Sequence, residues 1–547
     1  MATSSTNGTG DSSLLEKKGY TPLGDLDEIH ARLLKTYYSG KTKDVRWRKE
    51  QLKCLAYLVQ DNMDQFTEAI RLDLGRSKNE TYIVELSGIL NEIIDAVHNV
   101  EKWAKPTRPK VSFDMALLKP TIYKEPKGVA LIIGTWNYAV TLALGPMIGA
   151  ISAGCPAVLK CSEVTTHTGA LMANLIPKYL DQDAYAVVLG EVHVITRLLE
   201  MQWAHIFYTG NAKVARIIAA AAAKHLTPMT LELGGKSPCF IDPSLKDLNV
   251  AAKRILWGKR VNCGQTCISP DYVIVTRDQH PSLLLALQKE YARIFPSTFQ
   301  DLSKDDYPRI ASVHHFDRLK KMIENSQGKV VLQGQMDRES KLMGITVLDE
   351  VAWDDAVMQE EIFGPILPIV VVDSVDEALQ QIRPQTPLAL YVFSQSDAFI
   401  SKIRSKTQSG AFIVNDVMLH FNIGELPFGG VGESGTGSYH GKKSFDTFTH
   451  ERSSMTTPFW ADFLTSVRYY PYTDRNKAIF QATQAKKINF NRPSSIASLT
   501  NGSPSANTSA ASKVIKYALL AVIVALASRK LSWIVALIPK YKVVKVE

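Results

Sequence analysis

The residue of this chain that is best suited to covalent chemistry is Cys267. It ends the small-residue stretch Val261-Asn-Cys-Gly-Gln-Thr-Cys267, and an apolar run over 271–276 that predicts a strand follows it. A thiol at the edge of such an element can act as a nucleophile if the fold adds a base and an oxyanion donor. A buried cysteine more often only fills space in a core. From this stretch alone, a nucleophile and a packing thiol both fit.

Glu232 and Asn137 are the candidates for the two supporting roles. Glu232 lies inside an apolar run directly before Gly234-Gly235, where an unpaired acid is costly to bury. Burial raises the pKa of a carboxyl, which suits a general base, whereas a carboxylate at a strand end can also simply reach water. Asn137 follows another apolar run, and its amide suits either an oxyanion hole or the capping of a turn.

Polar residues near other predicted strand ends suit a nucleotide. Lys160 and Glu163 follow the second apolar run and can hold ribose hydroxyls, or they can line an exposed loop. Gly210 precedes a predicted helix whose N-terminus can bind an anion, as any α/β crossover turn can. Glu361 follows Glu360 before a turn, which by itself fits a surface acidic pair. No G-x-G-x-x-G follows the first strand, so that dinucleotide signature is absent.

The elements that must position these residues alternate between short apolar runs and helical segments. Helical patterns cover 26–62, 63–75 and 79–104, and an extended ribbon is predicted over 110–126. Buried strands are predicted over 128–134, 156–160, 184–189, 205–210 and 229–233, with helices over 140–152, 165–180 and 211–225. A second block has strands over 239–242, 272–276, 366–372, 390–393 and 410–415, with helices over 247–260 and 281–295. This alternation predicts an α/β fold with a doubly wound parallel sheet, in which ligands bind at the carboxyl ends of the strands.

Five motifs occur in a fixed order along the chain. They are Thr135-Trp-Asn-Tyr138, Leu231-Glu-Leu-Gly-Gly-Lys236, Asn262-Cys-Gly-Gln-Thr-Cys267, Glu361-Ile-Phe-Gly-Pro365 and Pro427-Phe-Gly-Gly-Val-Gly-Glu-Ser-Gly435. In these motifs the chain resembles the aldehyde dehydrogenase superfamily, from about residue 25 to 455. Two further segments, 223–228 and 437–445, resemble its class 3, fatty-aldehyde-type branch.

The resemblance implies a role for each candidate. Cys267 would form a thiohemiacetal and then a thioester, the Asn137 amide and the Cys267 backbone N–H would hold the oxyanion, and Glu232 would activate the hydrolytic water. The cofactor would be NAD, with NADP possible, since an acid at Glu163 favours a free ribose hydroxyl over a 2′-phosphate. Lys160 and Glu163 would hold the adenine ribose, and Glu361 the nicotinamide ribose. The implied cofactor-binding residues are Trp136, Lys160, Glu163, Thr209, Gly210, Val214, Gly234, Glu361 and Phe363.

Three residues stand apart from the family pattern. Ala139 occupies a position where the family often has proline, and Ala215 a position where it usually has glycine. Cys263, four residues before Cys267, has no implied role and fits either packing or an inactivating disulfide. No histidine lies near this pair, so a metal site is not expected.

The resemblance also predicts the domain organisation. The expected fold is that of an aldehyde dehydrogenase, with a Rossmann-like NAD-binding domain, an α/β catalytic domain and a β-ribbon oligomerisation arm. The predicted segments are a disordered N-terminus (1–20), the NAD-binding domain (21–232, with the ribbon at 108–126), the catalytic domain (233–440), an oligomerisation or return segment (441–491), a flexible linker (492–512) and a membrane anchor (513–547). A homodimer is expected.

The anchor is predicted from the apolar composition of residues 514–538. Arg529 and Lys530 interrupt this run, and bases flank both of its ends, which favours a span or an in-plane anchor at anionic lipid over a helix packed on the protein. The net charge of +9 is spread along the chain, and no nucleic-acid module accompanies it. No secretory signal is visible, so a cytosol-facing enzyme on the endoplasmic reticulum, the mitochondrial outer membrane or lipid droplets is expected.

The predicted activity is NAD-dependent oxidation of long, apolar aldehydes to acids. Fatty aldehydes are the expected substrates, and apocarotenoid or aromatic aldehydes are the alternatives. A catalytically inactive membrane scaffold is the alternative from another class, and the presence of Cys267, Glu232 and Asn137 argues against it.

Overall fold

The computed structural model describes residues 19–295 and 307–490, apart from 484 and 487. The chain divides into two compact units, 1–457 and 458–547, and all the strands that the structure describes belong to the first. The predicted linker and anchor lie outside the described residues, as does the predicted disordered N-terminus except for its last two residues. Among the helices of the described ranges, none is both long and apolar enough to cross a membrane.

The first sheet has six strands in the order β16-β6-β5-β2-β3-β4. Five of them are parallel, and β16 pairs antiparallel with β6 at the edge. The strands are β2 (Ala130–Ile133), β3 (Ala157–Lys160), β4 (Tyr185–Val188), β5 (His205–Thr209), β6 (Met229–Glu232) and β16 (Gly435–Thr436).

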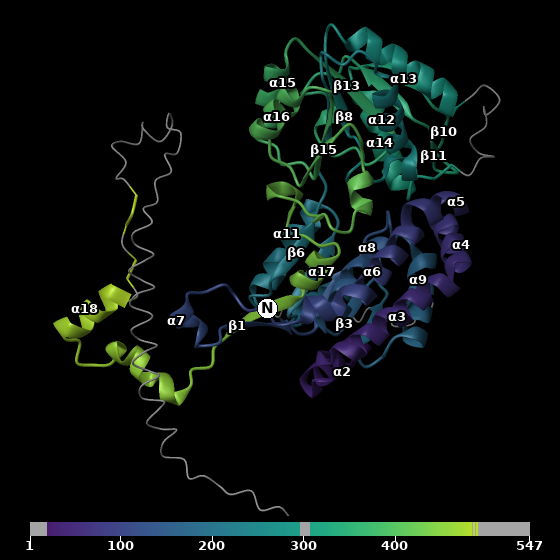
Figure 1. Cartoon of the computed structure of the whole chain (residues 1–547). Coiled ribbons are helices and arrows are strands. Elements are labelled where there is room, and N and C mark those ends of the chain that lie inside the picture. The colour runs from purple at the N-terminus through teal and green to yellow at the C-terminus, as the bar shows by residue number, and fades with distance from the viewer. Residues whose placement is uncertain (1–18, 296–306, 484, 487, 491–547) are drawn as a thin grey trace, which may run out of the picture. The chain divides into compact units, whose positions relative to one another are not determined.

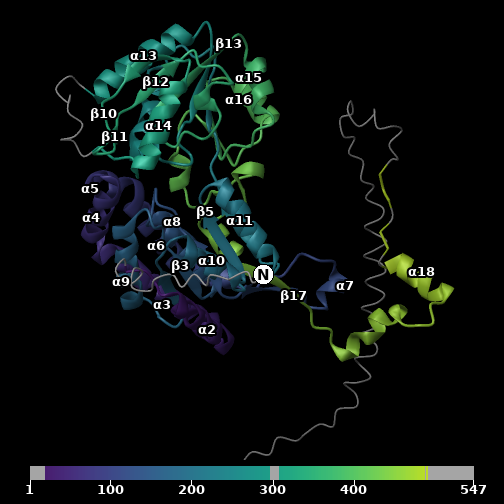
Figure 2. The same cartoon turned by 180° about the vertical axis from the view of Figure 1, so that it is seen from behind.

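Helices cover both faces of this sheet because its strands bury alternate residues in two different cores. In β2, Ile132 packs into one hydrophobic core and Leu131 into another. On the Ile132 side lie α3 (Val45–Asp61), α4 (Met63–Leu74), α6 (Ser87–Ala104), α8 (Thr141–Ala153) and α9 (Thr166–Tyr179). On the Leu131 side lie α2 (Leu23–Ser39), α10 (Val192–Glu200) and α11 (Ala212–Ala223), of which α10 and α11 are seen beside β5 in Figure 2.

The second sheet has seven strands in the order β15-β14-β7-β8-β13-β12-β9 and forms the teal and green body in Figure 1. All are parallel except β9, which is antiparallel to β12. The strands are β7 (Pro238–Ile241), β8 (Tyr272–Thr276), β9 (Lys329–Gln333), β12 (Thr346–Asp349), β13 (Ile366–Val372), β14 (Ala389–Phe393) and β15 (Ala411–Val414). On one face lie α12 (Asn249–Arg260) and α13 (His280–Ile294), and on the other α14 (Val313–Asn325), α15 (Val375–Ile382) and α16 (Asp397–Lys406).

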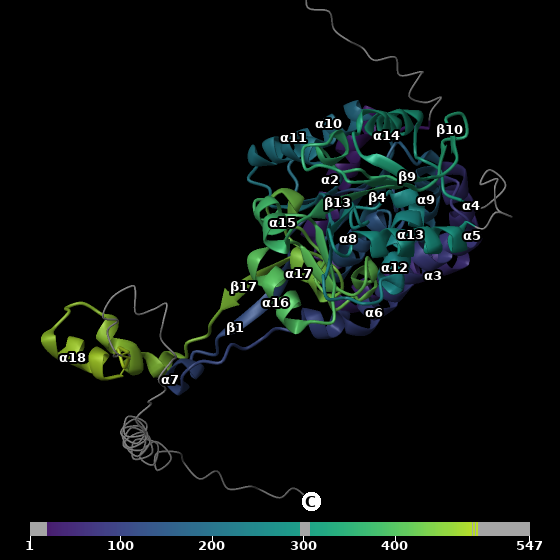
Figure 3. The same ribbon diagram turned by 90° about the horizontal axis from the view of Figure 1, so that it is seen from above.

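A two-stranded ribbon joins β1 (Thr121–Pro126) to β17 (Thr449–Ser454) in antiparallel register, and Figure 3 shows it leading away from the two sheets toward the short helix α7 (Phe113–Ala116). The ribbon predicted over 108–126 is therefore wrong in part, because 113–116 are helical and only 121–126 form a strand. The partner strand, Thr-His-Glu-Arg-Ser-Ser, is polar throughout and gave no strand pattern. A smaller ribbon pairs β10 (Met336–Asp337) with β11 (Leu342–Met343).

The α/β prediction is confirmed, and each strand predicted from an apolar run exists within one or two residues of its expected limits. The chain returns from the second sheet to the first through β16, which pairs Gly435 with Glu232. The segment predicted as the catalytic domain thus contributes a strand to the first sheet. In the second unit, a 3₁₀ segment (Phe459–Arg468) precedes α18 (Asp474–Thr483).

Candidate active site

The loop that carries Cys267 turns in an unusual way after α12. Asn262, Cys263 and Gly264 all have positive φ angles, of 49°, 55° and 69°. Only glycine, and to a lesser degree asparagine, adopts this left-handed region readily, so Cys263 is held there against its preference. A Cβ on Gly264 would lie 2.4 Å from the carbonyl oxygen of Gly364. The backbone of the 361–365 motif therefore packs directly on the Cys267 loop.

Buried hydrogen bonds hold this loop in place. The Asn262 side chain donates to the carbonyl of Asn137 at 2.9 Å, and its backbone N–H donates to the Glu80 carboxylate at 2.8 Å. Gln265 donates to the carbonyls of Asn262 at 3.0 Å and of Arg309 at 2.9 Å. Because these partners come from distant parts of the chain, the loop conformation depends on the complete first unit rather than on local preference.

Asn137 lies between β2 and α8, next to the Cys267 loop. Its side chain is 2% exposed, and its amide nitrogen donates to the backbone carbonyl of Gln265 at 3.1 Å. The Tyr138 hydroxyl lies 2.8 Å from Oγ1 of Thr266. Two contacts therefore join the Asn137 turn to the two residues that precede Cys267, and the Asn137 amide itself bonds to the Cys267 loop.

Glu232 is the last residue of β6 and is 3% exposed. Neither of its carboxylate oxygens accepts a hydrogen bond within the described part of the chain. Burial alone raises the pKa of Glu232 well above 4.5. The charge of Glu232 also acts on Cys267, so the two groups share one electrostatic environment.

Burial raises the pKa of the Cys267 thiol, and the carboxylates of Glu361 and Glu232 raise it further. The thiol therefore needs a base to become a nucleophile in this environment. Cys263 faces elsewhere: it packs in the core on the far side of the second sheet, and its Sγ lies 3.2 Å from the carbonyl of Met343. Cys267 packs against the other core. This divergence favours the packing interpretation of Cys263 over a disulfide.

A largely apolar cavity of about 120 Å³ opens onto Cys267. Its walls come from the π-helical turn before α6 (Tyr82–Leu86), from α8 and α12, from the Cys267 loop and from the segment 418–422. The lining residues are Ile83, Val84, Tyr138, Leu142, Trp257, Val261, Thr266, Cys267, Ile268, Met418, Leu419, Phe421 and Asn422. Such a wall favours an apolar ligand with one reactive polar end.

The residues predicted to hold the adenosine half of a cofactor lie at the carboxyl edge of the first sheet. Lys160 ends β3 and pairs with Glu163 at 2.6 Å. Thr209 ends β5, and its buried hydroxyl has no hydrogen-bond partner among the described residues. The Gly210 N–H donates to the carbonyl of Glu232 at 3.0 Å. The N–H of Val214 is occupied by the Asn211 side chain, which caps α11 at 2.9 Å.

The residues predicted for the nicotinamide half lie together at the junction of the two sheets. A Cβ on Gly234 would come within 2.1 Å of the Glu361 carboxylate, so any larger residue would have to displace that carboxylate. Burial, together with the charge of Asp271, raises the pKa of Glu361 to about 8. Phe363 has a φ of 51°, and its ring meets Trp136 edge to face, with 5.3 Å between the ring centroids.

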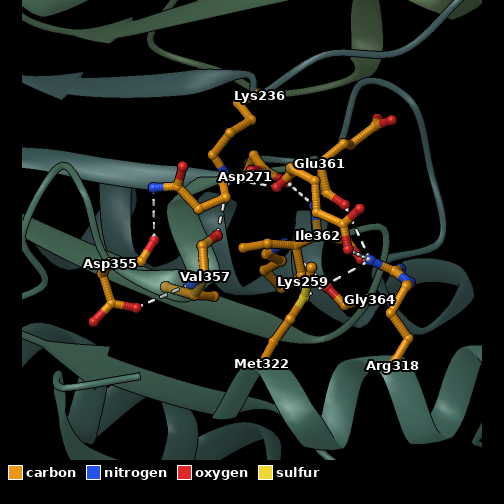
Figure 4. A network of polar contacts seen from close by, with 12 residues as sticks. Lys236, Lys259, Asp271, Arg318, Met322, Asp355, Val357, Glu361, Ile362 and Gly364 are labelled. Atoms are coloured by element: carbon orange, nitrogen blue, oxygen red, sulfur yellow. Dashed lines mark hydrogen bonds and ion pairs between the residues drawn. The ribbon is translucent and has the colours of Figure 1, made fainter. Parts of the chain in front are cut away.

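The Glu361 segment is held by a polar network that the sequence did not predict (Figure 4). Lys236 bonds to Asp271 and donates to the carbonyl of Glu360 at 3.0 Å. Asp271 accepts from the N–H of Ile362 at 3.0 Å, and Arg318 donates to the Ile362 carbonyl at 2.6 Å. Lys236 ends the sequence motif Leu231–Lys236. No sequence pattern indicated a role for Asp271 or Arg318, because their partners are about 40 to 90 residues away.

Known proteins resemble this chain in sequence and in structure. Residues 25–454 match the aldehyde dehydrogenase family. The chain is 42% identical over 444 residues to aldehyde dehydrogenase family 3 member A2 of Mus musculus, covering 81% of this chain and 91% of the relative. It is 41% identical over 455 residues to the dimeric, NADP-preferring aldehyde dehydrogenase of Rattus norvegicus, covering 82% and 98%. The structure of Staphylococcus aureus AldH in a substrate-bound state superposes with a TM-score of 0.79 at 36% identity, covering 83% and 98%.

The first sheet is a parallel, doubly wound sheet of the kind that binds nucleotides, and it is joined to a second α/β sheet. A thiol, a buried acid and an amide lie at the junction. This arrangement defines an oxidoreductase of the nicotinamide-dependent class. The chain belongs to the aldehyde dehydrogenase family. As a member of this family it is an enzyme that oxidises aldehydes with NAD or NADP.

Proposed function

We propose that this enzyme oxidises long, apolar aldehydes to carboxylic acids, with Cys267 as the nucleophile. The observation that carries the proposal is the position of Cys267 on the wall of an apolar cavity, in a loop that bonds to Asn137. The charge of the buried Glu232 acts on this thiol, and its carboxylate has no hydrogen-bond partner among the described residues. The similarity to family 3 member A2, and the class 3 segments 223–228 and 437–445, support the fatty-aldehyde class.

In the first step the Cys267 sulfur bonds to the aldehyde carbon. The thiol proton passes to the ionised form of Glu232, and the raised pKa makes this carboxylate a stronger base than an exposed one. The carbonyl oxygen becomes an oxyanion, and the Asn137 amide and the Cys267 backbone N–H donate to it. Bound NAD or NADP supplies the acceptor for the hydride that leaves the same carbon, and the product on Cys267 is a thioester.

Glu232 first releases the thiol proton to solvent, and in the second step its carboxylate takes a proton from water while the water oxygen attacks the thioester carbon. The same two donors hold the new oxyanion. When the C–O double bond re-forms, the C–S bond breaks and the Cys267 sulfur is displaced from the acyl carbon. The carboxylic acid then leaves the site. Glu232 therefore has to hold and release protons at one position in both halves of the reaction.

The residues present fit a dinucleotide. Thr209 offers a buried, unpartnered hydroxyl, and Gly210 and Gly234 lie where a Cβ would meet neighbouring side chains. Lys160, Glu163 and Thr209, with Gly210 and Val214, would hold the adenosine and phosphate part. Trp136, Gly234, Glu361 and Phe363 would hold the nicotinamide part. An acid at Glu163 favours NAD, although one relative is named NADP-preferring, so both cofactors are compared in the assay below.

The test is NADH or NADPH production with hexadecanal, an apocarotenal and benzaldehyde. The expected result is the highest kcat/KM with hexadecanal and NAD, a loss of activity in Cys267→Ser, and retained activity in the control Cys263→Ser. A wild type that oxidises none of these aldehydes supports the scaffold alternative and rejects the proposal. A higher kcat/KM with the apocarotenal or benzaldehyde rejects the fatty-aldehyde assignment alone.

We further propose a homodimer with a lipid-anchored tail over residues 513–547, which lie outside the described residues. The apolar run over 514–538, with flanking bases, supports the tail, and the word dimeric in the name of one relative supports the assembly. Deleting 513–547 should move the protein from the membrane pellet to the soluble fraction. A deleted protein that still pellets with membranes rejects the anchor, and a monomeric mass in light scattering rejects the dimer.

A further inference from the structure

A fully buried ion pair near the site has no part in the chemistry proposed above. Arg76 bonds through Nη2 to the Glu85 carboxylate, and neither side chain is exposed to solvent. Neither residue lines the cavity at Cys267. A buried ion pair costs desolvation energy that its own attraction often fails to offset, so stability alone is a weak reason for its presence.

The second oxygen of Glu85 binds the backbone that follows Asn137. It accepts from the N–H of Val140 at 2.8 Å and from the N–H of Thr141 at 3.1 Å. These are the first donors of α8, which begins without a side-chain cap because Val140 has no polar group. A carboxylate at a helix N-terminus also complements the positive end of the helix dipole. Glu85 thus fixes the end of the turn that carries Asn137.

Arg76 reaches the same turn from its other side. Its guanidinium carbon lies 5.1 Å from the centroid of the Tyr138 ring, a cation–π distance, and its Nε donates to Oγ1 of Thr81 at 3.3 Å. The Tyr138 hydroxyl in turn lies 2.8 Å from Oγ1 of Thr266, the residue before Cys267. The ion pair therefore contacts Tyr138, directly after Asn137, and the backbone of Val140 and Thr141 at the start of α8.

The turn needs such support because it has no regular structure of its own. Between the end of β2 at Ile133 and the start of α8 at Thr141, the backbone belongs to no helix or strand. Ala139 lies within it, and alanine leaves φ free where proline would fix it. The direction of the Asn137 amide therefore depends on its own hydrogen bonds to the Cys267 loop and on the contacts at Tyr138 and Val140.

We propose that Arg76 and Glu85 are positioning residues that aim the Asn137 amide at the oxyanion by fixing the turn between β2 and α8. This inference rests on the proposed function of Asn137 and extends it. Neither residue touches substrate, and their effect on the reaction passes through Asn137. A displacement of about 1 Å in a catalytic group can cost about 100-fold in rate.

The test measures one turnover of hexanal with enzyme and NAD in excess, in Glu85→Gln. Glutamine has the same shape but places an amide next to Arg76 or next to the α8 N–H groups. The expected result is a single-turnover rate constant 10- to 100-fold lower, with unchanged NADH amplitude and unchanged KM for NAD. If Glu85→Gln does not fold, Arg76→Lys, which keeps the charge without the planar fork, is measured in its place with the same expectation.

Asp73→Asn is the matched control. Asp73 is also a buried carboxylate at a helix start, where it accepts from the N–H of His167 at 3.1 Å and of Thr168 at 2.9 Å. It belongs to α4 and binds the start of α9, not the Asn137 turn. Its replacement should lower the melting temperature without changing the single-turnover rate constant by more than about twofold, given that helix caps contribute mainly to stability.

A double-mutant cycle with Asn137→Ala separates positioning from a general structural effect. In the Asn137→Ala background, Glu85→Gln should lower the rate constant by less than about twofold, because the group that it positions is absent. Full additivity of the two losses would overturn the inference, as would a lower amplitude with an unchanged rate constant. An inactive wild type would instead reject the proposed function itself.

Discussion

Replacing Glu232 by glutamine is expected to stabilise the protein at neutral pH while it stops turnover. The Glu232 carboxyl is 3% exposed, its oxygens accept no hydrogen bond from the described residues, and burial raises its pKa well above 4.5. The unfolded chain binds this proton less tightly, with a pKa of about 4.3. The stability that the protonated group contributes is complete below that pH, and it falls as the pH rises toward the folded pKa.

The size of the effect follows from the proton that only the folded state holds. Within this pH range the wild type loses about 1.4 kcal/mol of unfolding free energy per pH unit relative to a side chain that does not titrate. Glutamine has nearly the same shape and no proton to lose. In a chain of this length, 1 kcal/mol shifts Tm by ~2 °C or less. The Tm advantage of Glu232→Gln should therefore widen from pH 5 upward until the pH reaches the folded pKa of Glu232, and stay constant above it.

The assay compares melting temperatures of the two proteins at pH 5, 6, 7 and 8. Glu324→Gln is the control, because it makes the same substitution at a side chain that is 56% exposed. In parallel, Glu232→Gln should form about one NADH per site at most and then turn over at least 100-fold more slowly, since general bases contribute 10²- to 10⁴-fold. A constant Tm difference across the pH series would refute the reasoning, because it would mean that the carboxylate finds a partner or water in the folded state.

Three further predictions follow from the site. Gly234→Ala should weaken NADH binding at least tenfold, measured by fluorescence titration, because its Cβ would meet the Glu361 carboxylate; unchanged binding would contradict this close approach. Glu163→Gln should lower the preference for NAD over NADP, measured as the ratio of kcat/KM values, since it removes the charge paired with Lys160; an unchanged ratio would exclude Glu163 from the ribose site. Cys263→Ala should lower Tm yet keep kcat within about twofold, and should not protect against inactivation by oxidants; protection would favour the disulfide hypothesis.

The sheets could be predicted from the sequence because their strands are short, continuous apolar runs between helical segments. The residues at the carboxyl ends of those runs, such as Lys160 and Glu232, were therefore found at the edge of the first sheet. β16 could not be predicted, because it is two residues long and its pairing with β6 is set by close backbone packing. A Cβ on Gly435 would lie 2.1 Å from the carbonyl oxygen of Leu231, a constraint that no local pattern carries.

The groups that support the site were missed for a different physical reason. Glu80, Glu85 and Arg76 have the composition of an ordinary charged helix, and a helical pattern with charges normally indicates a solvated face. In the structure all three are buried, because their partners arrive from residues about 55 to 180 positions further along the chain. Such charged residues can be recognised as buried only when the position of each partner in space is known.

The left-handed turn at Asn262, Cys263 and Gly264 has a consequence for the order in which the enzyme matures. The turn is held by a hydrogen bond from Asn262 to Glu80 and by close packing of Gly264 on Gly364. The Cys267 thiol therefore reaches its position only after both of these segments have been synthesised and docked. During translation the reactive sulfur therefore belongs to an ordinary flexible stretch without its base or its amide donor. Recovery of activity on refolding should accordingly lag behind recovery of the helical circular dichroism signal, and simultaneous recovery would show that the turn forms on its own.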